Sequence, residues 1–93
     1  MALLDLLGRR WALRVLWELR DGPATFRALR ERCDDVSPTV LNTRLRELRD
    51  ADIVTLDDTS GYHTTPDGAE LLAALDPLHT WAVAWGRRTR RAG

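Results

Sequence analysis

The residues of this 93-residue sequence best suited to a chemical task are hydrogen-bonding side chains between Ser37 and Arg49. Thr39, Asn42, Thr43 and Arg46 are spaced so that a helix would present them on one side. Hydroxyl, amide and guanidinium groups recognise base edges in the major groove: the amide can bridge adenine N6 and N7, and the guanidinium can fork onto guanine O6 and N7. The stretch predicts a DNA-reading helix, and an ordinary amphipathic surface helix is the alternative that one motif leaves open.

The same stretch carries the signals that would fold it into a helix. Ser37 is a good N-cap, because its side chain can accept a hydrogen bond from a free N–H group of the first turn. Pro38 then occupies the first helical position, where its missing N–H costs nothing. Leu41, Leu45 and Leu48 recur at helical spacing and predict the buried face opposite the polar one.

Two helices are expected before this one. Residues 9–20 read as the first main helix, which the turn residues Asp21-Gly22-Pro23 would end. Thr25 can cap a short second helix with Phe26, Leu29 and Cys33 facing inward. A short helix, a tight turn and a second helix together form a helix-turn-helix unit.

A hairpin and a C-terminal helical region follow. The β-branched run 53–56 and residues 62–64 read as two strands around a polar turn, which is the position of a wing. Two aspartates in that turn leave two arrangements open: the wing stays off DNA, or Thr59, Ser60 and His63 make the contact. Thr65 caps the next helix, and Asp76-Pro77 predicts a break before a final helix.

Composition limits the function classes. The 14 arginines balance 14 acidic residues, and a zero net charge argues against a strong non-specific nucleic-acid binder. Cys33 is the single cysteine, so neither an internal disulfide nor a structural zinc site is expected, and a buried thiol is favoured. No signal peptide or apolar run of membrane length is present, which predicts a cytoplasmic protein with no membrane partner.

An enzyme is not expected. His63 and His79 have no Ser or Cys partner at a nucleophile-like position, and no glycine-rich phosphate loop is present. The carboxylates lie beside arginines at the spacing of helix salt bridges. The sequence therefore predicts no catalytic residue, no metal ligand and no cofactor.

Five short motifs, in this order, resemble the HxlR-type transcriptional regulators, which are relatives of the MarR-type. They are Gly8-Arg9-Arg10-Trp11, Gly22 to Leu29, Val36 to Leu48, Tyr62 to Gly68, and Leu78-His79-Thr80-Trp81. The resemblance runs from about Leu7 to Trp85. It implies a fold that is mainly α with a small β-hairpin, a winged helix-turn-helix formed by residues 1–93 as a single domain. The chain departs from the family in having no Cys before Gly8, and its wing is short and acidic.

The helix geometry and the resemblance together predict contacts with double-stranded DNA. The N-terminal half of a recognition helix lies in the major groove, and flanking arginines reach phosphates. Arg9 is a further candidate for a phosphate contact, and the alternative for each of these arginines is a solvated surface charge. The residues expected at DNA are Arg10, Arg27, Ser37, Pro38, Thr39, Asn42, Thr43, Arg44, Arg46, Arg49, Ser60 and His63.

The resemblance also implies a homodimer. Segments 1–8 and 77–91 would form its interface, because a small domain has more apolar side chain at its ends than one core uses. The alternative is that the late tryptophans cover the domain's own core. The basic run 87–91 reads as a solubilising end or as a tail on flanking phosphate. The interface residues expected are Leu3, Leu7, Leu78, Trp81 and Trp85.

The predicted function is therefore a dimeric, sequence-specific transcriptional regulator, more often a repressor in this family, on a near-palindromic operator. The sequence leaves open whether a small apolar effector binds beside Trp81 and Trp85. The alternative function is a winged-helix protein-interaction module without DNA binding, which the zero net charge and the acidic wing would suit.

Overall fold

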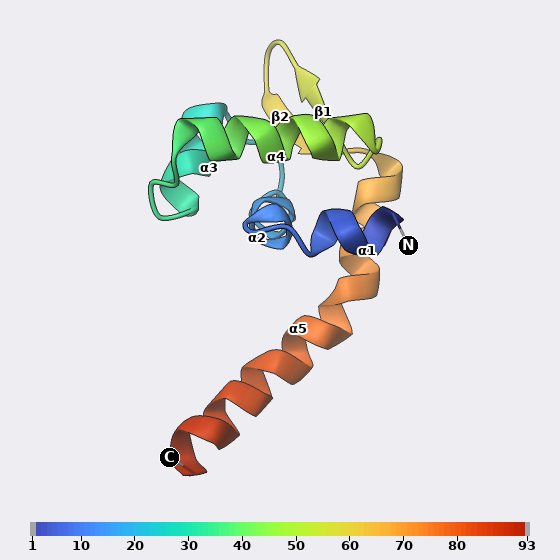
Figure 1. Cartoon of the computed structure of the whole chain (residues 1–93). Helices are drawn as coiled ribbons and strands as arrows, with labels where there is room; N and C mark the ends of the chain where they lie inside the picture. Colours follow the sequence, from blue (N-terminus) through green and yellow to red (C-terminus); the bar gives the residue numbers. More distant parts are fainter. Residues whose placement is uncertain (1, 93) are drawn as a thin grey trace.

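The structure, a computed structural model, describes residues 2–92, with side chains through residue 90. Figure 1 shows α4 lying across the top of the helical body, the hairpin projecting beyond it, and α5 running away from the body on the other side. The predicted fold class, mainly α with a small antiparallel hairpin, is confirmed. The elements are α1 (Ala2–Leu7), α2 (Ala12–Trp17), α3 (Phe26–Arg32), α4 (Pro38–Asp50), β1 (Val54–Asp57), β2 (Gly61–Thr64) and α5 (Pro66–Ala92).

The first main helix is shorter than predicted, so the expected bounds of 9–20 were wrong. Trp11 has a φ of 75°, a left-handed conformation that no regular helix contains, and α2 begins only at Ala12. At the other end, Leu19 and Arg20 donate to carbonyls three residues back, so the chain tightens into a turn before Gly22. The leucine-rich start forms the separate helix α1.

The helix-turn-helix unit forms as the capping residues predict. Thr25 Oγ1 accepts a hydrogen bond from the Ala28 N–H at 3.1 Å, at the start of α3. Ser37 Oγ accepts from the Val40 N–H at 3.4 Å, at the start of α4. Both predicted N-caps are confirmed.

One buried cluster joins the helices to the hairpin. Cys33 is fully buried, and burial raises the pKa of its thiol, as expected of an inert core cysteine. The predicted leucine face of α4 is also buried. The cluster consists of Val15, Leu16, Leu19, Ala24, Leu29, Cys33, Val36, Leu41, Leu45, Leu48, Ile53, Val54 and Leu72.

The hairpin is held to the body by a third short segment. β1 and β2 pair antiparallel, with Val54 opposite Thr64 and Asp57 opposite Gly61. Ala24, just before α3, exchanges two backbone hydrogen bonds with Tyr62, at 2.9 and 2.8 Å. Gly61 has a φ of 94° and lies so close to the Ala24 carbonyl that a side chain would not fit. The wing is thereby fixed to the helix-turn-helix unit.

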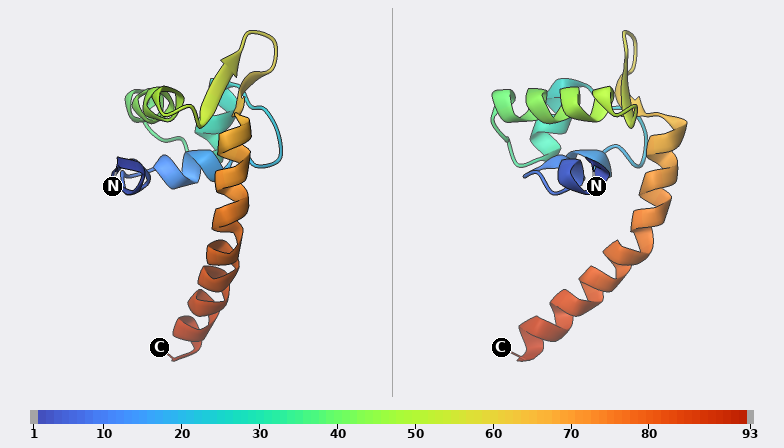
Figure 2. Two further views of the ribbon diagram at one scale, coloured as in Figure 1. Left: turned by 90° about the vertical axis from the view of Figure 1, so that its right-hand side faces the viewer. Right: turned by 45° about the vertical axis from the view of Figure 1, so that its right-hand side comes forward.

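The expected break at Asp76-Pro77 was wrong, because α5 continues through Pro77 to Ala92. Proline removes the N–H that would bond to the carbonyl four residues back, that of Ala73, and its ring pushes that carbonyl aside. Ala73 is exposed, so water can satisfy the freed carbonyl and the helix bends rather than ends. Figure 2 shows α5 changing direction near its middle.

Candidate nucleic-acid interface

The predicted base-reading residues share one exposed face of α4. Thr39, Asn42, Thr43 and Arg46 are all exposed, on the side opposite the buried leucines. Together with Pro38 and Phe26 they line a shallow hollow on the surface. The structure therefore brings together the residues that the sequence singled out, and it adds one from α3 that the sequence placed in the core.

Internal hydrogen bonds limit what this face can donate. The Thr43 hydroxyl donates to the Thr39 carbonyl at 2.9 Å, so it can offer a ligand only an acceptor lone pair and its methyl group. Among the side chains that the structure describes, Asn42 and Arg46 have no hydrogen-bond or ion-pair partner. Their donors are therefore free to bind base edges.

Arginine contacts to backbone carbonyls hold α3 to α2 and to the turn that leads into α4. Arg30 Nε donates to the Val36 carbonyl at 2.8 Å, across the turn that joins the two helices. Arg14, on α2, donates to the Arg32 carbonyl at 2.6 Å at the end of α3. A rigid support of this kind keeps the side chains of α4 at a constant geometry, which recognition of base edges requires.

Arg44 lies in an internal network instead of on the open surface. Its Nη1 pairs with Glu47 Oε1 at 2.5 Å, and its Nε donates to the Arg10 carbonyl at 2.7 Å. Arg9 pairs with the other oxygen of Glu47 at 3.0 Å. This placement argues against the predicted phosphate contact, because the guanidinium instead ties α4 to the loop before α2. The sequence could not show it, since Arg44 and Arg10 are 34 residues apart.

The other candidate phosphate contacts stay exposed. Arg10 and Arg49 are exposed and form no ion pair among the described side chains. Arg27 pairs with Glu31 at 3.6 Å along α3, yet its side chain is 91% exposed. A surface pair of that kind contributes little, so DNA phosphate can displace it.

The wing has a folded acidic tip. Asp57 Oδ1 accepts from the Thr59 N–H at 2.8 Å and from the Thr59 hydroxyl at 2.7 Å. These hydrogen bonds lower the pKa of Asp57, so it stays negatively charged. Ser60 is exposed in the turn, while His63 is half-buried with Nδ1 3.1 Å from the Thr64 carbonyl. Of the wing residues predicted at DNA, Ser60 is the more accessible.

Most of the predicted dimer residues are open to solvent. Leu78, Trp81 and Trp85 are 56%, 55% and 50% exposed on α5, and the two indoles stack with ring centres 6.0 Å apart. Leu3 is 39% exposed, but Leu7 is buried within its own domain and offers little surface to a partner. Met1 and the side chain of Arg91, which belong to the predicted segments, lie outside what the structure describes. Exposed apolar residues that the sequence analysis missed are Leu4, Leu13, Leu56 and Val83.

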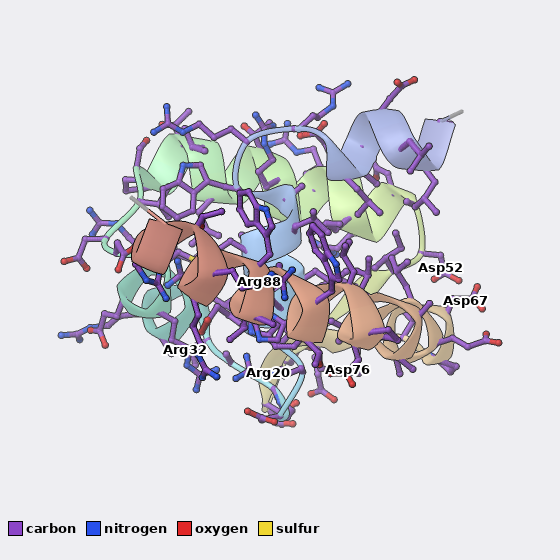
Figure 3. The ribbon with its side chains drawn as sticks, turned by 90° about the horizontal axis from the view of Figure 1, so that it is seen from below. Arg20, Arg32, Asp52, Asp67, Asp76 and Arg88 are labelled. Carbon is purple, nitrogen blue, oxygen red and sulfur yellow. The ribbon has the colours of Figure 1, made fainter. Side chains whose placement is uncertain are left out.

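An apolar groove of about 330 Å³ separates α2 from α5. Seen from below, α5 crosses in front of α2 (Figure 3). Leu13 and Leu75 are among the groove's apolar lining residues. Trp17 stacks on His79 with ring centres 4.1 Å apart, and Arg20 Cζ lies 4.3 Å from the centre of the Trp17 ring.

No group of metal-binding side chains gathers among the described residues. No helix within residues 2–92 has the length and apolar character needed to cross a bilayer. A capped helix-turn-helix, an attached hairpin and an exposed polar face on the second helix of the unit define a winged helix-turn-helix DNA-binding protein.

The particular family follows from comparison with known proteins. The model of the HxlR-like helix-turn-helix family matches residues 6–90, and the chain belongs to this family. It is 34% identical to the HTH-type transcriptional regulator YodB of Bacillus subtilis, over 84% of this chain and 75% of YodB. It is 27% identical to an HTH-type transcriptional regulator of Methanocaldococcus jannaschii, over 91% of this chain and 83% of that protein.

Solved structures agree. A Thermoplasma volcanium structure described as a possible HxlR family transcriptional factor superposes with a TM-score of 0.84 at 25% identity, covering 91% of this chain and 82% of that one. The quinone-bound YodB structure superposes with a TM-score of 0.80 at 31% identity, covering 89% and 93%. The protein is therefore a DNA-binding transcriptional regulator, from a family whose members are generally not enzymes. The alternative of an interaction module without DNA binding is not favoured.

Proposed function

We propose that this regulator acts as a homodimer on a near-palindromic operator and represses transcription there. The observation that carries the proposal is the exposed polar face of α4, whose Asn42 and Arg46 have free donors. Two such faces related by a two-fold axis, about 34 Å apart, would read half-sites one helical turn apart. Because the partner is DNA, we expect the protein in the cytoplasm.

Selection of bound duplexes from a random library, at near-physiological salt, tests the proposal directly. A two-fold symmetric enriched site is expected. Arg46→Ala should then lose discrimination at one base position per half-site, by about 1–3 kcal/mol. Arg20→Ala is the control, since Arg20 is also exposed but lies in the turn that follows α2, outside both α4 and the outer half of α5. Equal base preferences in the wild type and in Arg46→Ala would refute the role given to Arg46.

Salt dependence measures the phosphate contacts. Arg10, Arg27 and Arg49 are the exposed candidates. Each lost contact between an arginine and a phosphate should reduce the slope of log affinity against log salt by about 0.9, so a substitution present in both protomers of the dimer should reduce it by about 1.8. Arg49→Ala should therefore weaken binding to all sequences by a similar factor while keeping the preferred site. An unchanged slope would show that Arg49 contacts no phosphate.

The proposed dimer interface is the outer half of α5, together with the exposed Leu3 of α1, which lies beside the first half of α5. Support comes from Trp81 and Trp85, which are about half exposed on a helix that projects from the body. Monomeric proteins rarely leave large apolar patches open, and such patches mark interaction sites. Sedimentation should show a dimer for the wild type and a monomer for Trp81→Ala/Trp85→Ala. Leu56→Ala, which removes an apolar side chain of the hairpin that is 41% exposed, should remain dimeric.

Repression would follow from the bound dimer covering promoter DNA that polymerase needs. Deletion of the gene should raise transcription from a promoter that carries the selected operator. A fall in transcription would assign activation instead.

The proposed effector is a small planar apolar molecule bound in the groove between α2 and α5, which Leu78 and His79 line but Trp81 and Trp85, beside which the sequence placed it, do not. The apolar lining of the groove and its Trp17–His79 stack support this site. Quinones are the first candidates, because one YodB structure is quinone-bound. Since Cys33 is buried, binding should be reversible. Saturable quenching of Trp fluorescence, reversed by dialysis, is expected, and its absence across a broad panel would refute the site.

A further inference from the structure

We propose that Phe26 is a specificity-determining residue that contacts the 5-methyl group of a thymine in each half-site. Phe26 is the one residue of α3 in the hollow that Pro38, Thr39, Asn42, Thr43 and Arg46 line on the outer face of α4. The inference rests on the proposed DNA-binding function and adds a base-type preference to it.

The Phe26 ring contacts both the core and the hollow. The ring is half-buried and packs against the core cluster, and its remaining surface opens into the hollow. α3 is fixed to α4 through the contact of Arg30 with the Val36 carbonyl, so the ring has a constant position relative to Asn42 and Arg46. An aromatic ring held in this way forms an apolar floor between polar groups.

An internal hydrogen bond of α4 leaves the hollow with fewer free donors than its residue types suggest. The Thr43 hydroxyl donates to the Thr39 carbonyl, so Thr43 can add only an acceptor lone pair and its methyl group to the lining. Pro38 contributes a ring without a donor. Phe26, Pro38 and Thr43 therefore present carbon within a surface otherwise suited to base edges.

Thymine is the base that matches this arrangement. In the major groove it displays a 5-methyl group beside the O4 acceptor, and no other base carries a methyl group there. The free donors of Asn42 or Arg46 could serve the neighbouring base while the methyl group enters the hollow. Burying a methyl group in this way corresponds to about 4-fold in affinity, from roughly 0.8 kcal/mol per buried carbon.

The test combines a base change with a side-chain change. In the selected operator, each thymine is replaced in turn by deoxyuridine, which lacks only the methyl group. The wild type should lose about 4-fold in affinity at one thymine per half-site, and about 16-fold when both half-sites are changed. Phe26→Ala, with its folding checked by thermal unfolding, should bind the thymine and uracil operators equally.

Other results would overturn the proposal. An equal loss on uracil substitution in the wild type and in Phe26→Ala would place the methyl contact elsewhere. No sensitive thymine, with a specific operator in hand, would refute the methyl contact while leaving the proposed function intact. Failure to select any operator would instead refute the proposed function.

A second measurement uses the unaltered protein, because Phe26→Ala removes part of the core. Replacing the sensitive thymine with 5-iodouracil and irradiating the complex should cross-link the peptide that contains Phe26. Cross-links confined to other peptides would overturn the assignment.

Discussion

Replacing Thr65 by valine should lower the free energy of unfolding, because Thr65 holds the junction between the wing and α5 together. The Thr65 hydroxyl donates to the Asp52 carbonyl at 2.6 Å and accepts from the Gly68 N–H at 3.0 Å. Thr65 is the one buried polar side chain among the described residues, and Gly68 is buried with it. Figure 3 shows Asp52 and Asp67 at this same edge of the molecule.

Valine keeps the shape of threonine and replaces only the hydroxyl, by a methyl group. Loss of the N-cap of α5 costs about 1–2 kcal/mol, toward the upper end because the Gly68 N–H is left buried. Loss of the hydrogen bond to the Asp52 carbonyl adds about 1 kcal/mol. The free energy of unfolding should therefore fall by about 2–3 kcal/mol, or roughly 10–20 °C in Tm for a domain of this size.

Urea and thermal unfolding at one fixed protomer concentration would measure the change, since any association makes Tm concentration-dependent. Thr65→Ser is the matched control, because it retains the hydroxyl and the cap and loses only a methyl group. Its cost should be about 1 kcal/mol. A Thr65→Val protein whose free energy of unfolding lies within about 0.5 kcal/mol of the wild type would refute the reasoning. Ordinary surface substitutions change stability by that much.

Three further predictions concern single sites. Gly68→Ala should destabilise the fold severely, because a Cβ there would overlap the Ile53 carbonyl oxygen; a wild-type Tm would contradict this. Cys33 should resist alkylation until the chain unfolds. Because burial raises the pKa of its thiol, the contribution of Cys33 to stability is complete below the unfolded thiol pKa of about 8.5. That contribution is lost as pH rises through the pKa of the folded state. Rapid alkylation of the native protein, or an alkaline unfolding profile unchanged in Cys33→Ala, would count against it. The carboxyl of Asp57 should titrate below its usual pKa by NMR, so its contribution to hairpin stability is present above the unfolded pKa and is lost as pH falls through the folded value; Thr59→Val should move that pKa upward, and no movement would show that the hydroxyl does not matter.

Local signals predicted the recognition helix well. The Ser37 cap and the leucine face of α4 depend on residues close in sequence, so spacing alone was sufficient. The same holds for Thr65, whose cap on α5 was also expected. These elements place the polar face of α4 at the surface, which is why the candidate site was visible before the fold.

Features that depend on contacts between distant segments were not predictable in this way. Arg44 carries the sequence pattern of a flanking phosphate contact, and only the fold shows that the Arg10 carbonyl and Glu47 occupy it. Phe26 has the spacing of a core residue, and its open side depends on where α4 crosses α3. Pro77 signals a helix end, yet exposure of the preceding turn lets the helix continue as a bend.

The bend in α5 has a mechanical consequence. From Pro77 to the end of α5 at Ala92 the helix is about 22 Å long, so it acts as a lever arm whose pivot is the proline. A rotation of about 10° at the pivot moves the far end by about 4 Å, from the rise of 1.5 Å per residue. That displacement is close to the 3.4 Å rise of one base step. In the proposed dimer, the stiffness of this single joint would set how many base pairs of operator spacing the protein tolerates.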